Sequence, residues 1–135
     1  ALAVLMPIVA SMGGNAGTQT IAVAVRAIAM RQLDSVSTRN FIFREFLVAL
    51  LNGLVFAGLA GLVSFIWFND PEIAVIMAVA MFANLLVAGL TGTLVPLGLL
   101  RSGVDPAVAS SVFVTTTTDV VGFSVFLGLA ALYLI

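Results

Sequence analysis

The sequence has no cysteine, no histidine and no lysine, and charged residues of any kind make up only 8% of it. Without cysteine it forms neither disulfides nor thiolate metal sites, and without histidine it has no imidazole ligand. The same absences remove the H-E-x-x-H motif and the serine–lysine pair that an intramembrane hydrolase would need, so we do not expect an enzyme. A net charge of −1, with no basic tract, argues against a nucleic-acid partner.

The residues that are present are strongly apolar. Hydrophobic types make up 62% of the 135 residues, and the mean hydropathy is +1.27. A soluble domain usually has about 25% charged residues, so this composition predicts a membrane domain in contact with the lipid bilayer. The chain starts within an apolar run that no basic segment precedes. Such a start is typical of a piece of a larger protein rather than of a signal peptide.

Charged and turn-forming residues divide the sequence into four long apolar segments. They cover about residues 1–30, 46–68, 73–100 and 107–135 and together form one transmembrane domain. Each reaches or exceeds the roughly 20 residues that a helix needs to cross a hydrocarbon core of about 30 Å. Helices in a soluble bundle would keep a polar face, which these runs lack. We therefore predict an all-α membrane protein, with a bundle of four transmembrane helices in this chain.

The few charges predict how these helices are oriented. Arginines gather in two connections, at about residues 31–45 and 101–106, whereas the connection Asn69–Glu72 is acidic. Loops with an excess of basic residues are usually cytoplasmic. We therefore expect both arginine-bearing loops to be cytoplasmic and the acidic turn and the C-terminus to lie outside. The chain would then be a multi-pass protein of the plasma (inner) membrane.

Small residues recur at every fourth position in the second and third segments, which places them on one face of each helix. The stripes are Ala49, Gly53, Ala57 and Gly61 in the second segment, and Ala80, Asn84, Ala88 and Gly92 in the third. In lipid, such faces let helix backbones approach closely. We interpret both stripes as packing seams and expect polar residues of these helices, Asn84 among them, to form hydrogen bonds between helices.

Asp119 is the only charged residue in the last apolar segment. A carboxylate near the bilayer centre costs roughly 2.5–3.5 kcal/mol on insertion scales, so it normally faces a partner or a water-filled cavity. Thr118 precedes it directly, and Thr115 and Ser111, one and two helical turns earlier, share its face. With no lysine or histidine to pair with it, we predict that Asp119 binds a cation at the end of this strip of oxygen atoms. A protonated or arginine-paired structural aspartate is the alternative.

A second polar cluster lies in the first segment. Its members are Gly13, Gly14, Asn15, Gly17, Thr18 and Gln19. Glycines lower helix propensity and expose backbone carbonyls, and Pro7 upstream removes a helical donor. Irregular backbone at membrane depth is tolerated where it lines a cavity, and Asn15, Thr18 and Gln19 fall at helical spacing. We predict that this cluster lines an ion path; a close helix crossing that uses glycine for clearance is a compatible alternative.

Depth connects the two clusters. At about 1.5 Å per residue from the cytoplasmic ends, Asp119 lies roughly 18 Å and Gly14 roughly 24 Å into the membrane. Carboxylate, amide, hydroxyl and carbonyl oxygens suit a hard cation such as Mg²⁺, Ca²⁺ or Mn²⁺. Mg²⁺ gives up water reluctantly and is commonly held by one or two carboxylates through retained waters. One Asp119 per chain fits such an ion, especially if a two-fold axis brings two together.

Two motifs in these clusters resemble the membrane domain of the MgtE family of magnesium transporters. They are G-G-N-x-G-x-Q at Gly13–Gln19, after Pro7, and T-x-T-D-x-x-G ending at Gly122, and the similarity extends over essentially the whole chain. The resemblance implies a homodimer with five spans per subunit, of which this chain would supply the second to fifth. It also implies a pore at the dimer interface, lined by both motifs including Gly122. The family's cytoplasmic regulatory domains are absent from this chain.

The leading hypothesis is therefore magnesium transport through a channel-like pore at a homodimer interface, driven by the electrochemical gradient. The membrane potential supplies about 4.6 kcal/mol per 100 mV to a divalent ion, and the sequence has no P-loop motif for ATP. Mg²⁺ would be the transported ion, bound mainly through water, with other divalent cations as further candidates. The alternative is an ion-coupled secondary transporter of divalent cations, in which Asp119 takes a proton or Na⁺ at a midplane site.

Overall fold

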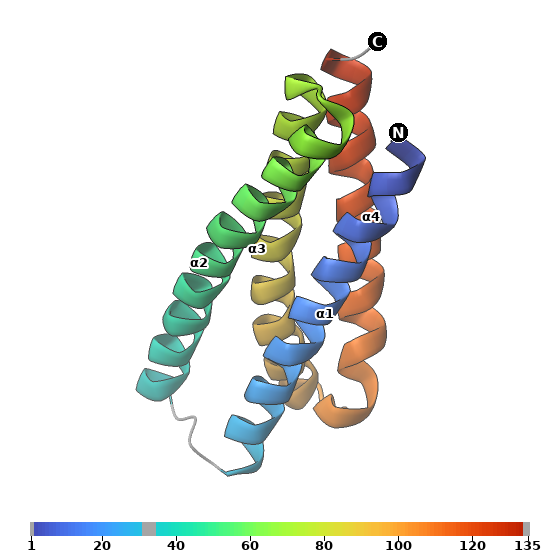
Figure 1. The fold of residues 1–135 in the computed structure, drawn as a ribbon. Coiled ribbons are helices and arrows are strands. Elements are labelled where there is room, and N and C mark those ends of the chain that lie inside the picture. Colours follow the sequence, from blue (N-terminus) through green and yellow to red (C-terminus); the bar gives the residue numbers. More distant parts are fainter. Residues whose placement is uncertain (1, 31–34, 134–135) are drawn as a thin grey trace.

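The computed structural model describes residues 2–30 and 35–133, and this part of the chain forms four α-helices and no strand. The helices are α1 (Leu2–Ala29), α2 (Ser35–Phe68), α3 (Pro71–Arg101) and α4 (Pro106–Tyr133). They lie alongside one another in a single bundle (Figure 1). The predicted all-α fold class is confirmed. The predicted outer limits at Ala1 and Ile135 lie outside the described residues.

A two-residue turn joins α2 to α3. Asn69 adopts a left-handed conformation with a φ of 51°, which asparagine tolerates better than most residues. Asp70 is the N-cap of α3, and its carboxylate accepts a hydrogen bond from the backbone N–H of Glu72 at 3.0 Å. Pro71 follows at the start of the helix, where a backbone N–H would have no helical acceptor. So short a turn requires α2 and α3 to run antiparallel.

α2 is longer than the apolar segment that predicted it. We expected the apolar span from about residue 46, with a cytoplasmic connection at about 31–45, and the helix that contains this span begins earlier, at Ser35. Charges end an apolar run without ending a helix, because arginines such as Arg39 and Arg44 are good helix formers. The predicted loop is therefore helical over residues 35–45, and residues 31–34 lie outside the described part of the chain.

α3 occupies the centre of the bundle. It packs against α1, α2 and α4, whereas the extensive contact of α2 is with α3 alone. Half of the residues in the most apolar window of α3 are buried, against 22% in α2 and in α4. Figure 1 shows the α2–α3 turn, the start of α1 and the end of α4 toward one end of the bundle. The end of α1, the start of α2 and the α3–α4 connection lie toward the other.

Small residues determine how closely α2 and α3 approach. A Cβ atom placed on Gly61 would lie 3.1 Å from the Cβ of Ala78, which is tighter than an ordinary contact. Gly89 of α3 faces Ala49 of α2 so closely that a side chain on Gly89 would overlap with it. These contacts confirm that the α2 stripe is a packing seam, as expected where helices associate in lipid through close packing. The α3 stripe packs against α1 instead, where a Cβ atom on Gly92 would lie 2.7 Å from the Cβ of Thr20.

The main apolar core lies in the half of the bundle nearer the α2–α3 turn. It is built mostly from α3, with contributions from the other three helices: Leu5, Val9, Ala57, Ile73, Ile76, Met77, Ala80, Met81, Leu85 and Phe126. A smaller buried cluster of Ala24, Ala27 and Phe41 lies toward the other end. Between these two clusters the bundle is held by contacts that include glycines and polar side chains, and this is where the candidate site lies.

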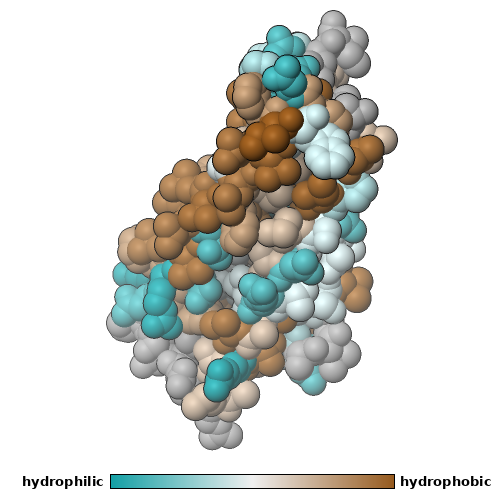
Figure 2. Space-filling view, in the orientation of Figure 1, coloured by the Kyte–Doolittle hydropathy of each residue, from teal (hydrophilic) through white to brown (hydrophobic). Residues whose placement is uncertain are grey.

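The outer surface of the bundle is apolar along most of its length. Ile66 and Trp67 of α2 are 71% and 78% exposed, and hydrophobic side chains cover the middle of α2 in Figure 2. Among the described residues, three segments are long and apolar enough to cross a membrane: Thr38–Phe68, Pro71–Arg101 and Ser110–Tyr133. They agree with the predicted multi-pass membrane protein. α1 carries the polar cluster in its middle and does not reach the same hydropathy, so its crossing of the membrane stays a prediction.

Candidate functional site

α1 and α4 run antiparallel and touch at three points, each four residues from the next on both helices. The contact pairs are Val9 with Gly122, Gly13 with Thr118, and Gly17 with Val114. A Cβ atom added to any of these three glycines would come within 2.5–3.4 Å of the partner side chain. We call these three contacts the α1–α4 seam. Its regular four-residue step means that α1 and α4 keep one register through the middle of the bundle.

The seam leaves no space for an ion between α1 and α4 inside one chain. A Cβ atom on Gly17 would overlap with Val114, and one on Gly13 or Gly122 would already contact the partner side chain at 3.2 or 3.4 Å, so a hydrated cation does not fit in the seam. Four of the predicted lining residues, Gly13, Gly17, Thr118 and Gly122, are buried in it. The hydroxyl of Thr118 donates to the backbone oxygen of Thr115 at 3.0 Å and so is satisfied within its own helix. These four residues therefore bring the two helices together.

The remaining predicted lining residues lie on the outer surface of the chain. Asn15, Thr18, Gln19, Ser111 and Thr115 are exposed, and Gly14 and Asp119 are half-buried. Asp119 directly follows Thr118 and Gly14 directly follows Gly13, so both lie at the level of the same seam contact. One residue turns the helix by about 100°, which moves both positions out of the seam toward the surface. The two predicted clusters thus share one level, as the depth argument required.

The carboxylate of Asp119 lies in the middle of α4, which runs from Pro106 to Tyr133. It makes no hydrogen bond or ion pair with any described residue. Within the described part of the chain, no group of three or more acidic, histidine or cysteine side chains gathers that could hold a bare metal ion. A single carboxylate with hydroxyl neighbours fits a cation that keeps most of its water.

α1 is a continuous helix through the glycine-rich cluster, which corrects one prediction. We expected irregular backbone and free carbonyl groups, but the helix runs from Leu2 to Ala29 with Pro7 inside it. The carbonyl of Gly14 also accepts a hydrogen bond from the Thr18 hydroxyl at 2.9 Å. In apolar surroundings an unpaired backbone group costs more than the low helix propensity of glycine. Gly13 and Gly17 serve as close contact points, which was the alternative interpretation of this cluster, whereas a Cβ atom on Gly14 would meet nothing within 4 Å.

Asn84 of α3 contacts both helices of the seam, a role that sequence reasoning did not reach. It is fully buried, and its Nδ2 donates to the backbone oxygen of Val9 at 2.9 Å. This bond confirms the expectation of an interhelical hydrogen bond at Asn84. A Cβ atom on Gly122 would lie 2.9 Å from the same nitrogen, and one on Gly13 would overlap with it. The signal in the sequence was a polar residue within a stripe of small ones, where its amide must meet a neighbouring backbone.

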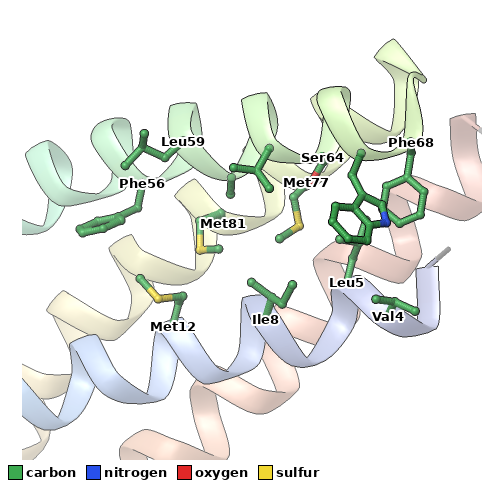
Figure 3. Close-up of a pocket in the computed structure, with 13 residues that line it drawn as sticks. Val4, Leu5, Ile8, Met12, Phe56, Leu59, Ser64, Phe68, Met77 and Met81 are labelled. Carbon is green, nitrogen blue, oxygen red and sulfur yellow. The ribbon is translucent and has the colours of Figure 1, made fainter.

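Two clefts between α1 and α2 are separate from Asp119. The larger, of about 450 Å³, lies over α3 and is lined almost wholly by apolar side chains such as Phe56 and Met77 (Figure 3). It offers an ion almost no oxygen donors. The smaller, of about 140 Å³, contains Gln19 of α1 with Glu45 and Asn52 of α2. Gln19 therefore lies at the edge of α1 that faces α2.

Comparison with known proteins points to one family. A family model described as a divalent cation transporter, MgtE, matches residues 6–129. The chain is 34% identical over 134 residues to the magnesium transporter MgtE of Bacillus subtilis, covering 99% of this chain and 30% of that protein. It is 33% identical over 133 residues to the magnesium transporter MgtE of Enterococcus faecalis, covering 98% of this chain and 29% of that protein.

A third relative is similar to the same extent. The chain is 36% identical over 135 residues to the magnesium transporter MgtE of Thermus thermophilus, covering 99% of this chain and 30% of that protein. In all three cases the chain spans about 30% of the length of the curated relative that it matches. The family model covers all residues of the α1–α4 seam, and it also covers the exposed polar residues Asn15, Thr18, Gln19, Ser111 and Thr115.

The exposed side chains of Ser111 and Thr115 on α4 can be tested for contact with water. Because the chain has no cysteine of its own, a single introduced cysteine is the only thiol that a reagent can modify. A charged thiol reagent reacts only where water reaches the thiol. We expect it to modify Thr115→Cys, on the exposed strip, and to leave Thr118→Cys unmodified because Thr118 is fully buried. Leu62→Cys on α2, where Leu62 is 56% exposed on an apolar face, is the lipid-facing control. If Thr115→Cys were modified no faster than Leu62→Cys, lipid rather than water would cover this face of α4.

Proposed function

Because the chain belongs to the MgtE family of divalent cation transporters, we propose that it forms the pore-bearing part of a magnesium transporter. The path is channel-like and is lined by the exposed faces of α1 and α4, with Asp119 as its carboxylate. The observation that carries this proposal is the carboxylate of Asp119, which has no partner among the described residues and lies in the middle of an apolar helix. Its insertion cost, about 2.5–3.5 kcal/mol, is offset when a cation and water face it.

The path lies at a homodimer interface. Within one chain the seam closes the space between α1 and α4, while the oxygen donors Asn15, Thr18 and Thr115 lie exposed on the outside. A two-fold axis beside this face would bring two copies of it together and enclose water between them, since residues near such an axis meet their own copies. Two Asp119 carboxylates would then face a hydrated Mg²⁺, which is commonly held by one or two carboxylates.

The continuity of α1 favours a channel over the alternative secondary transporter. Coupled transporters commonly build their midplane sites from discontinuous helices, whereas α1 is helical from Leu2 to Ala29. For Mg²⁺ the membrane potential supplies about 4.6 kcal/mol per 100 mV, which drives uptake without a second ion. Mg²⁺ current that persists with no proton or Na⁺ gradient distinguishes the two mechanisms.

The bundle sits in the plasma membrane with its arginine-bearing end on the cytoplasmic side. α1 also crosses the membrane in this arrangement, as the first span of this chain, since it lies alongside α3 and α4. The end of α3, at Arg101, and the start of α2 lie toward the end of the bundle opposite the α2–α3 turn (Figure 1). The first turns of α2 contain Arg39 and Arg44, and the α2–α3 turn leads into Glu72. The positive-inside rule then places the α2–α3 turn and the C-terminus outside.

The first test of the path is Asp119→Asn. We expect Mg²⁺ uptake by the full-length protein in proteoliposomes to fall by about tenfold or more, the equivalent of about 1.4 kcal/mol, because the amide keeps the shape and removes the charge. Asp70→Asn is the matched control: it also removes one carboxylate, but at the helix end, where asparagine caps a helix as well as aspartate does. Normal Mg²⁺ uptake by a well-folded Asp119→Asn protein would refute the proposed path.

The dimeric arrangement predicts a magnesium-dependent assembly. Two ionised Asp119 side chains facing each other repel, and Mg²⁺ bound between them stabilises the assembled state through preferential binding. The dimer fraction in detergent should therefore rise with Mg²⁺ in the wild type, and in Asp119→Asn it should be high and insensitive to Mg²⁺. If Mg²⁺ raised the dimer fraction equally in both proteins, the two Asp119 carboxylates would not face each other in the dimer.

The orientation is tested by cysteines at two exposed positions, Asn69 in the α2–α3 turn and Ser102 after α3. A membrane-impermeant thiol reagent added to intact cells should label Asn69→Cys and not Ser102→Cys, and inverted vesicles should give the opposite pattern. Labelling of both positions from one side would contradict a crossing by α3. Labelling of Ser102→Cys alone in intact cells would reverse the orientation.

A further inference from the structure

One buried side chain holds the α1–α4 seam from the third helix. Asn84 is fully buried at the centre of α3, and its amide donates to the backbone oxygen of Val9 on α1 at 2.9 Å. The hydroxyl groups nearby behave differently: those of Thr18, Thr93 and Thr118 donate to backbone oxygens three or four residues back in their own helices. The amide of Asn84 thus reaches between helices where these hydroxyls do not.

The same amide fills the space opposite two glycines. A Cβ atom on Gly122 of α4 would lie 2.9 Å from its Nδ2 and 3.3 Å from its Cγ, and a Cβ atom on Gly13 of α1 would overlap with the amide. One flat group therefore packs against α1 and α4 together. Its size sets how far apart these two helices stand, because both backbones rest on it.

This contact lies at the level of the candidate ion path. Gly13 contacts Thr118, and Asp119 is the next residue. Gly122 follows Asp119 by three residues, nearly one helical turn. Any change in the space occupied by Asn84 therefore displaces α4 relative to α1 at the level of Asp119.

A purely structural role would not need an amide here. The Oδ1 atom of Asn84 is buried with no hydrogen-bond partner among the described residues. An unsatisfied buried acceptor is unfavourable, and an apolar residue of similar shape would avoid it. The amide is thus a poor choice for packing alone, whereas its bond to Val9 and its flat contact with both glycines define one spacing.

We propose that Asn84 is a positioning residue that sets the spacing of α1 and α4 at the level of Asp119, and thereby the size of the divalent cation that passes. The inference rests on the proposed magnesium path. It predicts that Asn84 variants change the preference among cations of different size, and that the effects of Asn84 and Gly13 substitutions depend on each other, as those of residues in contact do.

The test combines two substitutions. Gly13→Ala places a methyl group where the amide of Asn84 lies, and we expect Mg²⁺ uptake by the full-length protein in proteoliposomes to fall about tenfold. Asn84→Ala removes the obstructing amide, so the double variant should recover most of that loss. Gly128→Ala is the matched control, since a Cβ atom on Gly128 of α4 meets nothing within 4 Å and should leave uptake unchanged.

The cation preference separates positioning from folding. Uptake of Mg²⁺ and of the larger Ca²⁺ is measured per folded protein for the wild type, Asn84→Ala and the double variant. A folding defect leaves the ratio of the two uptakes unchanged, whereas a changed helix spacing alters it, and we expect the Mg²⁺ to Ca²⁺ ratio of Asn84→Ala to shift by about tenfold. If Gly13→Ala does not fold, Gly122→Ala, whose Cβ meets the end of the same amide, takes its place in the pair.

Failure of the positioning role and failure of the proposed magnesium path give different results. A wild-type protein that carries no Mg²⁺ refutes the magnesium path itself. A wild type that carries Mg²⁺ normally, with an unchanged Mg²⁺ to Ca²⁺ ratio in Asn84→Ala, refutes the positioning role alone. Additive losses in the double variant refute it as well, because they show that Gly13 and Asn84 act separately.

Discussion

Contact between helices through glycine is the constraint on which this bundle depends. In lipid, apolar side chains gain little by leaving one apolar environment for another, so helices associate through close packing and hydrogen bonds. Gly89 lets α2 pack closely against α3. Gly13 and Gly122 let α1 and α4 pack closely against each other and against the side chain of Asn84. A methyl group at any of these positions would clash with the side chain that it faces, so the helices would have to move apart at that level.

This close packing explains why the polar side chains face outward. Because the seam between α1 and α4 is filled by helix-to-helix contact, Asp119 finds no partner in the part of the chain that the structure describes and lies half-buried at the surface of the bundle. A mid-helix carboxylate on an otherwise apolar surface is unfavourable in lipid. The chain therefore presents a face that water, an ion or a second copy must cover, whereas its large groove beside α2 is apolar and needs only acyl chains or another helix.

Local signals in the sequence predicted most of the fold. Apolar runs located the helices, and Pro71 and Pro106 mark starts of α3 and α4 within two residues of the expected positions. The apolar run at 46–68 did not by itself locate the start of α2, because charged residues such as Arg39 end a hydrophobic run without ending a helix. The site was harder, since the direction of each side chain depends on the α1–α4 register, which pairs residues about a hundred positions apart. The bond from Asn84 to Val9, 75 residues away, is set by the same packing.

The two-residue turn between α2 and α3 couples the rotation of one helix to that of the other. Asn69 and Asp70 are the only residues between them. The rotation of α2 about its own axis is therefore set by the capped first turn of α3. Each residue of a helix corresponds to about 100° of rotation. Deleting one residue within the first turn of α3 would therefore rotate all of α2, carry Ala49 and Gly61 away from the face of α3, and expose a different longitudinal stripe of α2 to the bilayer.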